Sequence, residues 1–151
     1  MLNKVFHFDT PREYYVADAA VVWCFDHRFD LAFAKFLKRS GVVTTDVIKV
    51  AGGAKALAAP AGDANREFVV EQIRTSVRLH GTKSIILMLH SDCGAYGGLG
   101  AFEGDAAAEA EHHEAELARA AATVSELFPG IDVRAYFVDF NGVWEMTRVA
   151  S

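Results

Sequence analysis

The sequence predicts an α/β fold in which a mostly parallel central sheet is flanked by helices and ends in a C-terminal hairpin or edge strand. Short apolar runs at 16–24, 46–50 and 84–90 have the length and character of buried strands. Longer segments in which apolar residues recur with helical spacing separate these runs. Strands that alternate with helices are typical of parallel sheets with crossover connections, so this class follows.

The first two helices are expected between the apolar runs. Asp30 is the expected N-cap of a helix that continues through Ser40 and that Gly41 would end. A second helix should start near 63–65 and stop at Gly81, immediately before the central strand. Each helix is long enough to return the chain to the start of a parallel strand.

The last third of the chain supplies another helix and the closing strands. The helix is expected over 105–128, before a Pro-Gly pair. Strands are expected over 132–139 and 143–149, around Asn141–Gly142, a dipeptide favoured in hairpin turns. At the other end of the chain, residues 3–8 alternate weakly and predict an edge strand or an arm.

Composition limits the class of protein. A single domain over residues 1–151 fits the length, and 52% hydrophobic residues suffice for a sizeable core. The net charge of −5 argues against nucleic acid, which selects basic faces. The first residues lack the apolar core of a signal peptide, and no run approaches the roughly 20 apolar residues of a membrane span. We therefore expect a cytoplasmic protein with reduced cysteines and no membrane partner.

A candidate metal site follows the central apolar run. His90 and Cys93 stand three residues apart at its end, and side chains that leave the carboxyl edge of an open α/β sheet commonly form its site. An imidazole and a thiol can share one metal ion, and zinc accepts both. The only other cysteine, Cys24, ends the first apolar run and is a candidate third ligand. The alternative is that both cysteines are small buried core residues.

Two segments, C-F-D-H-R from Cys24 and H-S-D-C-G from His90, resemble the paired motifs of the β-class carbonic anhydrases. The family pattern is Cys-x-Asp-x-Arg at one strand end and His-x-x-Cys-Gly at another. Both motifs occur here in that order, about seventy residues apart. The likeness continues through Ala51–Gly53, through the run that leads into His90, and through the closing segment from Val133 to Val149. It therefore covers most of the chain.

The resemblance implies zinc-dependent, reversible hydration of carbon dioxide to bicarbonate by a zinc-bound hydroxide. It implies that Cys24, His90 and Cys93 are the zinc ligands, and that Asp26 and Arg28 form a pair that orients the nucleophile. In some members the aspartate instead ligates the zinc in a closed state, so the resemblance leaves both states open. Members usually form dimers or larger assemblies, which implies a homodimer or higher homo-oligomer.

Other functions fit the same residues. A related hydrolase on this fold could attack carbonyl sulfide or carbon disulfide, as some relatives do. A non-catalytic zinc-binding or interaction protein would have a closed site, with Asp26 as a fourth ligand. The pair of Asp26 and Arg28 could also be an ordinary ion pair that closes a loop.

Two histidines are candidate proton carriers or pocket residues. His27 stands where the family usually has Ser or Ala and could accept protons, although a position facing solvent or a neighbouring subunit is favoured. His113 lies four residues before Leu117, so it falls on the buried stripe of its predicted helix. It could be a proton shuttle, a polar contact of the pocket, or a histidine at the edge of an acidic helix.

Several turn residues are expected close to the site. Gly52, Gly53 and Gly94 should permit tight backbone there, because glycine adopts conformations that other residues rarely do. Asp92 is expected to cap the glycine-rich turn that follows it.

Overall fold

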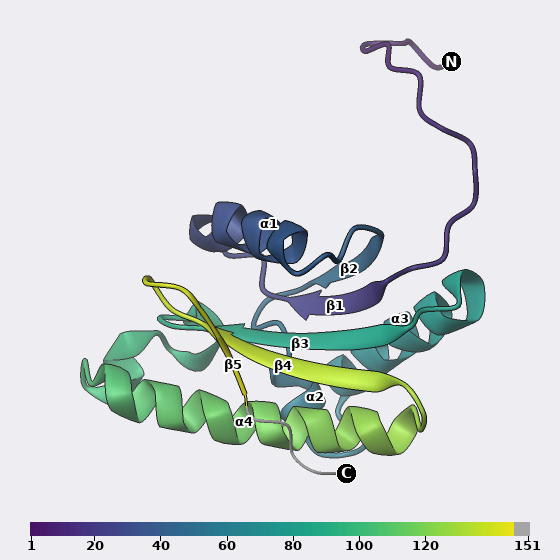
Figure 1. Ribbon diagram of the computed structural model, residues 1–151. Coiled ribbons are helices and arrows are strands. Elements are labelled where there is room, and N and C mark those ends of the chain that lie inside the picture. Colours follow the sequence, from purple (N-terminus) through teal and green to yellow (C-terminus); the bar gives the residue numbers. More distant parts are fainter. Residues whose placement is uncertain (147–151) are drawn as a thin grey trace.

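A five-stranded sheet forms the centre of the molecule in the computed structural model, which describes residues 1–146 (Figure 1). The strand order is β2-β1-β3-β4-β5; the first four strands are parallel and β5 is antiparallel to β4. The expected class is confirmed. The strands are β1 (Ala19–Trp23), β2 (Thr45–Lys49), β3 (Ser84–His90), β4 (Asp132–Val138) and β5 (Val143–Glu145).

Within residues 1–146, four α-helices cover the two faces of this sheet (Figure 1). They are α1 (Asp30–Arg39), α2 (Lys55–Ala58), α3 (Ala64–His80) and α4 (Ala106–Leu127). The loops of this described part also contain three short 3₁₀ helices: η1 (His27–Phe29), η2 (Gly94–Tyr96) and η3 (Leu99–Phe102). Asp63 and Asp105 cap α3 and α4 through their side chains. Gly81 ends α3 in the left-handed conformation, as the sequence predicts.

The core has two parts because side chains alternate across the sheet. Ala20 and Val22 of β1 face one cluster, in which α2, α3 and α4 pack against the sheet. Val21 and Trp23 face the other, which α1 covers through Leu37 and neighbouring aromatic rings. All five residues of β1 are buried, so this strand and β3 form the fixed centre of the fold.

The structure departs from the expected elements in several places. Asp30 is the first residue of α1 rather than its cap, because the chain is already helical over η1. Its carboxylate instead accepts from Lys49 and contacts His27. The short helix α2 was not expected. Residues 1–16 form no helix or strand and extend away from the sheet as an arm (Figure 1).

The end of the chain bears on two further expectations. Strand β5 confirms the closing hairpin as far as Glu145, and residues 147–149 of the expected strand lie outside the described part. Within residues 1–146, no helix is both long enough and apolar enough to cross a bilayer.

Candidate metal centre

The site lies where the strand order reverses. From β1 the chain moves to β2 on one side, whereas β3 pairs with the other side of β1. Open α/β sheets form a crevice at such a point, beyond the carboxyl ends of the two strands. Cys24 directly follows β1, and His90 ends β3. The topology therefore brings together residues far apart in the sequence.

Gly53 holds these two strand ends apart. The pairing of β1 with β3 stops at Val22 and Leu87, and the backbone of Gly53 lies just beyond it. A Cβ atom on Gly53 would come within 2.6 Å of the Met88 carbonyl oxygen and 2.9 Å of the Cys24 nitrogen. Its φ of +54° also favours glycine. The expected need for glycine next to the site is met at this position.

Three donor atoms converge in the resulting space. The ligand atoms of Cys24, His90 and Cys93 all lie within 4.8 Å of one another, and all three residues are buried. The Nδ1 atom of His90 contacts the Ser91 carbonyl oxygen at 2.7 Å. Since that oxygen can only accept, Nδ1 carries the hydrogen and Nε2 offers a lone pair. Within residues 1–146, Nε2 has no hydrogen-bond partner although it is buried.

An unpaired nitrogen beside two sulfurs is a poor arrangement for a core and a good one for a metal. Buried polar atoms normally find partners. Two thiols and one imidazole are also a known donor set for zinc, and three protein ligands leave a fourth position for chemistry. The residues present therefore fit a zinc ion, with Cys24, His90 and Cys93 as the ligands.

The electrostatics of the cluster favour a cation. The pKa of Cys24 is lowered to about 4, chiefly because the neighbouring Cys93 thiol stabilises its thiolate. The same closeness raises the pKa of Cys93. Burial alone would lower the pKa of His90, but the nearby Cys24 sulfur, the Ser91 carbonyl and the Asp26 carboxylate raise it. The two sulfurs thus share one proton, which a divalent ion would displace.

Asp26 and Arg28 form a pair next to the donor cluster. Arg28 donates to Asp26 from Nε at 3.1 Å and from Nη2 at 2.7 Å, and its backbone nitrogen donates at 3.0 Å. These bonds lower the pKa of Asp26 to about 2. Asp26 is not part of the three-residue cluster: its carboxylate faces Arg28 and lies 4.0 Å from Nε2 of His90.

Asp92 extends this pair into the ligand loop. Its carboxylate accepts from Arg28 Nη1 at 3.0 Å, and its backbone carbonyl accepts from Nη2 at 3.0 Å. Its other carboxylate oxygen accepts from the Leu99 nitrogen at 2.8 Å. Asp92 therefore caps the turn, as expected, and also ties Arg28 to the loop between His90 and Cys93.

Aromatic rings cover one side of Arg28. The guanidinium carbon lies 5.7 Å from the Phe29 ring centre and 5.5 Å from that of Phe140. Phe29 is buried and also packs against the His90 ring, with 4.6 Å between ring centres. Phe140 is largely exposed and comes from the β4–β5 turn. Sequence reasoning missed Phe140, since nothing local links position 140 to the site.

His113 is fully buried, as its place on the helix stripe predicts. Its ring lies among those of Tyr96, Phe102 and Phe137, and neither nitrogen has a hydrogen-bond partner within residues 1–146. Burial lowers its pKa to about 4, with Glu109 opposing the shift. The imidazole is therefore neutral at pH 7, and the arrangement favours packing over proton uptake.

His27 and Gly94 are close to the site in the sequence, but neither belongs to the donor cluster found in the described residues. The His27 side chain is 96% exposed and its Nδ1 contacts Asp30 at 3.0 Å, which matches the favoured solvent-facing position. Gly94 has a negative φ and open space where a Cβ would stand. Unlike Gly53, it gives no steric reason for glycine.

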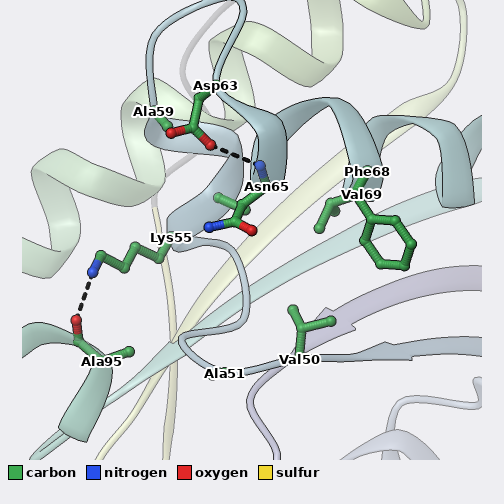
Figure 2. Close-up of a pocket in the computed structure, with 10 residues that line it drawn as sticks. Val50, Ala51, Lys55, Ala59, Asp63, Asn65, Phe68, Val69 and Ala95 are labelled. Carbon is green, nitrogen blue, oxygen red and sulfur yellow. Dashed lines mark hydrogen bonds between the residues drawn. The ribbon is translucent and has the colours of Figure 1, made fainter.

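A cavity of about 420 Å³ adjoins the loops that carry the site. Figure 2 shows its wall: Lys55 reaches across to donate to the Ala95 carbonyl oxygen, and Val69 and Phe68 come from α3. Ala51 also lines it. The cavity contains none of the three cluster residues, so it is a neighbouring space rather than the metal centre itself.

Comparisons with known proteins agree with this geometry. A family model described as "Putative carbonic anhydrase" matches residues 16–150. No curated protein gives a significant match.

Solved structures of β-carbonic anhydrases share the fold. The isoform I enzyme of Trichomonas vaginalis has 19% identity and a TM-score of 0.63, over 95% of this chain and 90% of that one. The carbonic anhydrase of Streptococcus mutans has 22% identity and a TM-score of 0.58, over 92% and 88%. That of Glaciozyma antarctica has 19% identity and a TM-score of 0.55, over 89% and 84%.

Proposed function

Because this chain belongs to the family described as "Putative carbonic anhydrase", we propose that it binds one zinc ion and catalyses the reversible hydration of carbon dioxide to bicarbonate. The observation that supports this most directly is the cluster of Cys24, His90 and Cys93, with their donor atoms within 4.8 Å of one another. Zinc bound there would supply the Lewis acidity that brings the pKa of a water molecule from 15.7 to about 7.

The protein's own part begins with Asp26. Its carboxylate is ionised at neutral pH because its pKa is lowered to about 2, so it can only accept hydrogen bonds. A carboxylate in this position can accept the O–H of an attacking water and point its lone pair outward. Arg28 holds the carboxylate by several bonds at once, which fixes its direction.

The aromatic rings serve the substrate. Carbon dioxide is small and carries no charge, so an apolar wall suits it better than further charged groups. Phe29 and Phe140 provide such a wall beside Arg28. The centres of these two rings lie 5.1 Å apart, so they form one continuous apolar surface next to Arg28.

The proton released in each turnover must reach solvent. We propose that His113 packs the interior beside the site and that buffer carries the proton, because a buried imidazole with a pKa of about 4 holds protons poorly at pH 7. His27 is exposed and remains the histidine better placed to exchange protons with solvent.

We further propose a homo-oligomer in the cytoplasm. Leu2, Val5, Phe6 and Phe8 of the arm are all more than 70% exposed, and a second copy of the chain would cover them. Tyr15 fixes the base of this arm, since its hydroxyl donates to Asp46 at 2.5 Å. A reducing compartment would keep Cys24 and Cys93 as the free thiols that the site needs.

Stopped-flow carbon dioxide hydration on protein of known zinc content tests the function. We expect about one zinc per chain and hydration well above the buffer rate, with both lost in Cys24→Ser. The matched control is His27→Asn, a change of an exposed residue next to the site, which should keep its zinc. Full zinc in Cys24→Ser contradicts the ligand assignment. Zinc without hydration, combined with turnover of carbonyl sulfide or carbon disulfide, would favour the related hydrolase.

A further inference from the structure

Glu109 is buried, carries a carboxyl group and has no part in the proposed reaction. It lies in the first turn of α4, and only 1% of its surface is exposed. Burying such a group is costly unless its oxygens are hydrogen-bonded. Both oxygens are indeed used: Oε1 accepts from the Ser91 hydroxyl at 2.5 Å and Oε2 accepts from the Asp92 backbone nitrogen at 2.8 Å.

The second of these bonds connects Glu109 to His90 through a single peptide group. The Asp92 nitrogen and the Ser91 carbonyl oxygen belong to the same peptide unit. That oxygen accepts from His90 Nδ1 at 2.7 Å. The order of contacts is therefore carboxylate, peptide N–H, peptide C=O and imidazole N–H. Hydrogen bonds in such a chain polarise and strengthen one another.

The local backbone needs this support. Asp92 adopts a φ of +53°, a left-handed conformation that is unfavourable for a residue with a side chain. Such conformations persist where the surroundings fix them. Glu109 holds the nitrogen of Asp92, whereas Arg28 and Leu99 hold its side chain. Together these contacts fix the orientation of the peptide plane whose oxygen accepts from His90.

We propose that Glu109 is a positioning residue for the metal ligand His90, acting through the peptide that joins Ser91 to Asp92. It aims the Ser91 carbonyl at Nδ1, which keeps the hydrogen there and leaves the lone pair of Nε2 directed at the two sulfurs. Metal-binding histidines commonly donate their second N–H to a carboxylate or a carbonyl, and this outer partner tunes metal affinity. Here the outer partner is a peptide carbonyl, and the Glu109 carboxylate on α4 acts on the histidine through that peptide unit. The proposal rests on the proposed zinc site.

Glu109→Gln tests the proposal, because its neutral amide oxygen is a weaker acceptor for the Asp92 N–H than a carboxylate oxygen, even where its NH2 group donates to the Ser91 hydroxyl. Zinc affinity is measured by competition with a chelator, and we expect it to fall about 10-fold or more. Glu109→Asp keeps two acceptor oxygens and should bind zinc more tightly than Glu109→Gln. The matched control is Glu111→Gln, which makes the same change in charge at an exposed position of the same helix. Equal zinc affinity in Glu109→Gln and Glu111→Gln would overturn the proposal.

Proton NMR on the wild-type protein gives a readout that depends on neither zinc nor activity. The Asp92 amide hydrogen and the His90 Nδ1 hydrogen should both exchange slowly and resonate downfield. Rapid exchange of the Asp92 amide in folded wild-type protein would refute the proposal even if Glu109→Gln failed to fold. If the wild-type protein binds no zinc, the proposed function fails. The two resonances would still decide whether Glu109 is connected to His90 through the Ser91–Asp92 peptide.

Discussion

The carboxylate oxygen Oδ2 of Asp26 lies 4.0 Å from Nε2 of His90, the nitrogen that faces the two sulfurs. The distance is too long for a direct hydrogen bond, so the carboxylate lies next to the imidazole without bonding to it. Arg28 keeps the carboxylate at that distance by binding both of its oxygens. The proposed role of Asp26, to orient water bound at the cluster, depends on this closeness.

Replacement of Asp26 by asparagine should separate chemistry from metal binding. We expect Asp26→Asn to keep its zinc and to hydrate carbon dioxide about 100-fold or more slowly, because an amide nitrogen donates where the carboxylate accepts. Stopped-flow rates and metal analysis on the same sample measure both effects. Asp30→Asn is the matched control, since it removes a partly exposed acid at the start of α1 that has no hydrogen bond or ion pair with Arg28 in the described residues. An unchanged rate in Asp26→Asn would leave the pair with Arg28 as a purely structural contact.

Acidification should weaken the fold through His113. Its folded pKa of about 4 lies below the usual value of 6.5, so the unfolded chain binds more protons between these pH values. The stability is fully present above pH 6.5 and is lost as the pH falls toward 4. Since a tenfold change in proton affinity corresponds to about 1.4 kcal/mol, the loss should be on the order of 3 kcal/mol.

Urea unfolding at several pH values between 7 and 4 measures this loss. His113→Phe, a ring that suits the aromatic surroundings, should show a shallower decline than the wild type, whereas His7→Asn in the arm should not. Parallel curves for His113→Phe and the wild type would contradict the assignment. Turnover of His113→Phe in weak buffer should stay near the wild-type rate; a large fall that imidazole restores would instead identify His113 as a proton shuttle.

The glycine between the two strand ends should tolerate no side chain. We expect Gly53→Ala to lower the free energy of unfolding by about 2 kcal/mol or more, because the added Cβ meets the backbone of Met88 and Cys24 in a conformation that already disfavours alanine. Gly94→Ala has free space around it and should change the free energy of unfolding by about 1 kcal/mol at most. Chemical denaturation of the two variants compares them directly. Similar losses in both would mean that the backbone around residue 53 moves easily.

The apolar arm should determine the assembly state. We expect the double variant Phe6→Ser and Phe8→Ser to have a lower mass in solution than the wild type, measured by light scattering on a size-exclusion column. The rings of Phe6 and Phe8 are stacked on one another, with 6.5 Å between centres, and have no cover within the described chain. Leu127→Ser removes a half-exposed apolar side chain elsewhere and should leave the mass unchanged. An unchanged mass in the double variant would assign the assembly, if there is one, to another surface.

The sequence predicted the strands and the cluster residues well because both are local signals. A short, wholly apolar run such as Ile85–Leu89, followed by a turn, is typical of a strand buried on both faces of a sheet, and His90 and Cys93 lie just after it. Parallel pairing then places Cys24 at the same sheet edge. Predicting that the three donors meet therefore requires only that the two strands be parallel neighbours in the sheet.

The contacts around the cluster could not be predicted in this way. Phe140 contacts Arg28 because the β4–β5 turn packs against it. Glu109, in the first turn of α4, accepts from the Asp92 nitrogen in the loop between His90 and Cys93. Both depend on how long each loop is and how each helix lies, which no local pattern encodes. Asp30 shows the same limit on a smaller scale: a 3₁₀ turn ahead of it shifts the helix start and frees its carboxylate for Lys49.

The separation of the donors in the chain has a consequence during synthesis. Cys24 leaves the ribosome 69 residues before Cys93, a delay of about 3–14 s at about 5–20 residues per second. Until β3 has emerged, β1 has at least one unpaired edge, and the Cys24 thiol lacks the His90 and Cys93 donors of the cluster. A nascent chain in this state is open to edge pairing and to oxidation. Loading of metal at the proposed site should therefore follow the synthesis of Cys93.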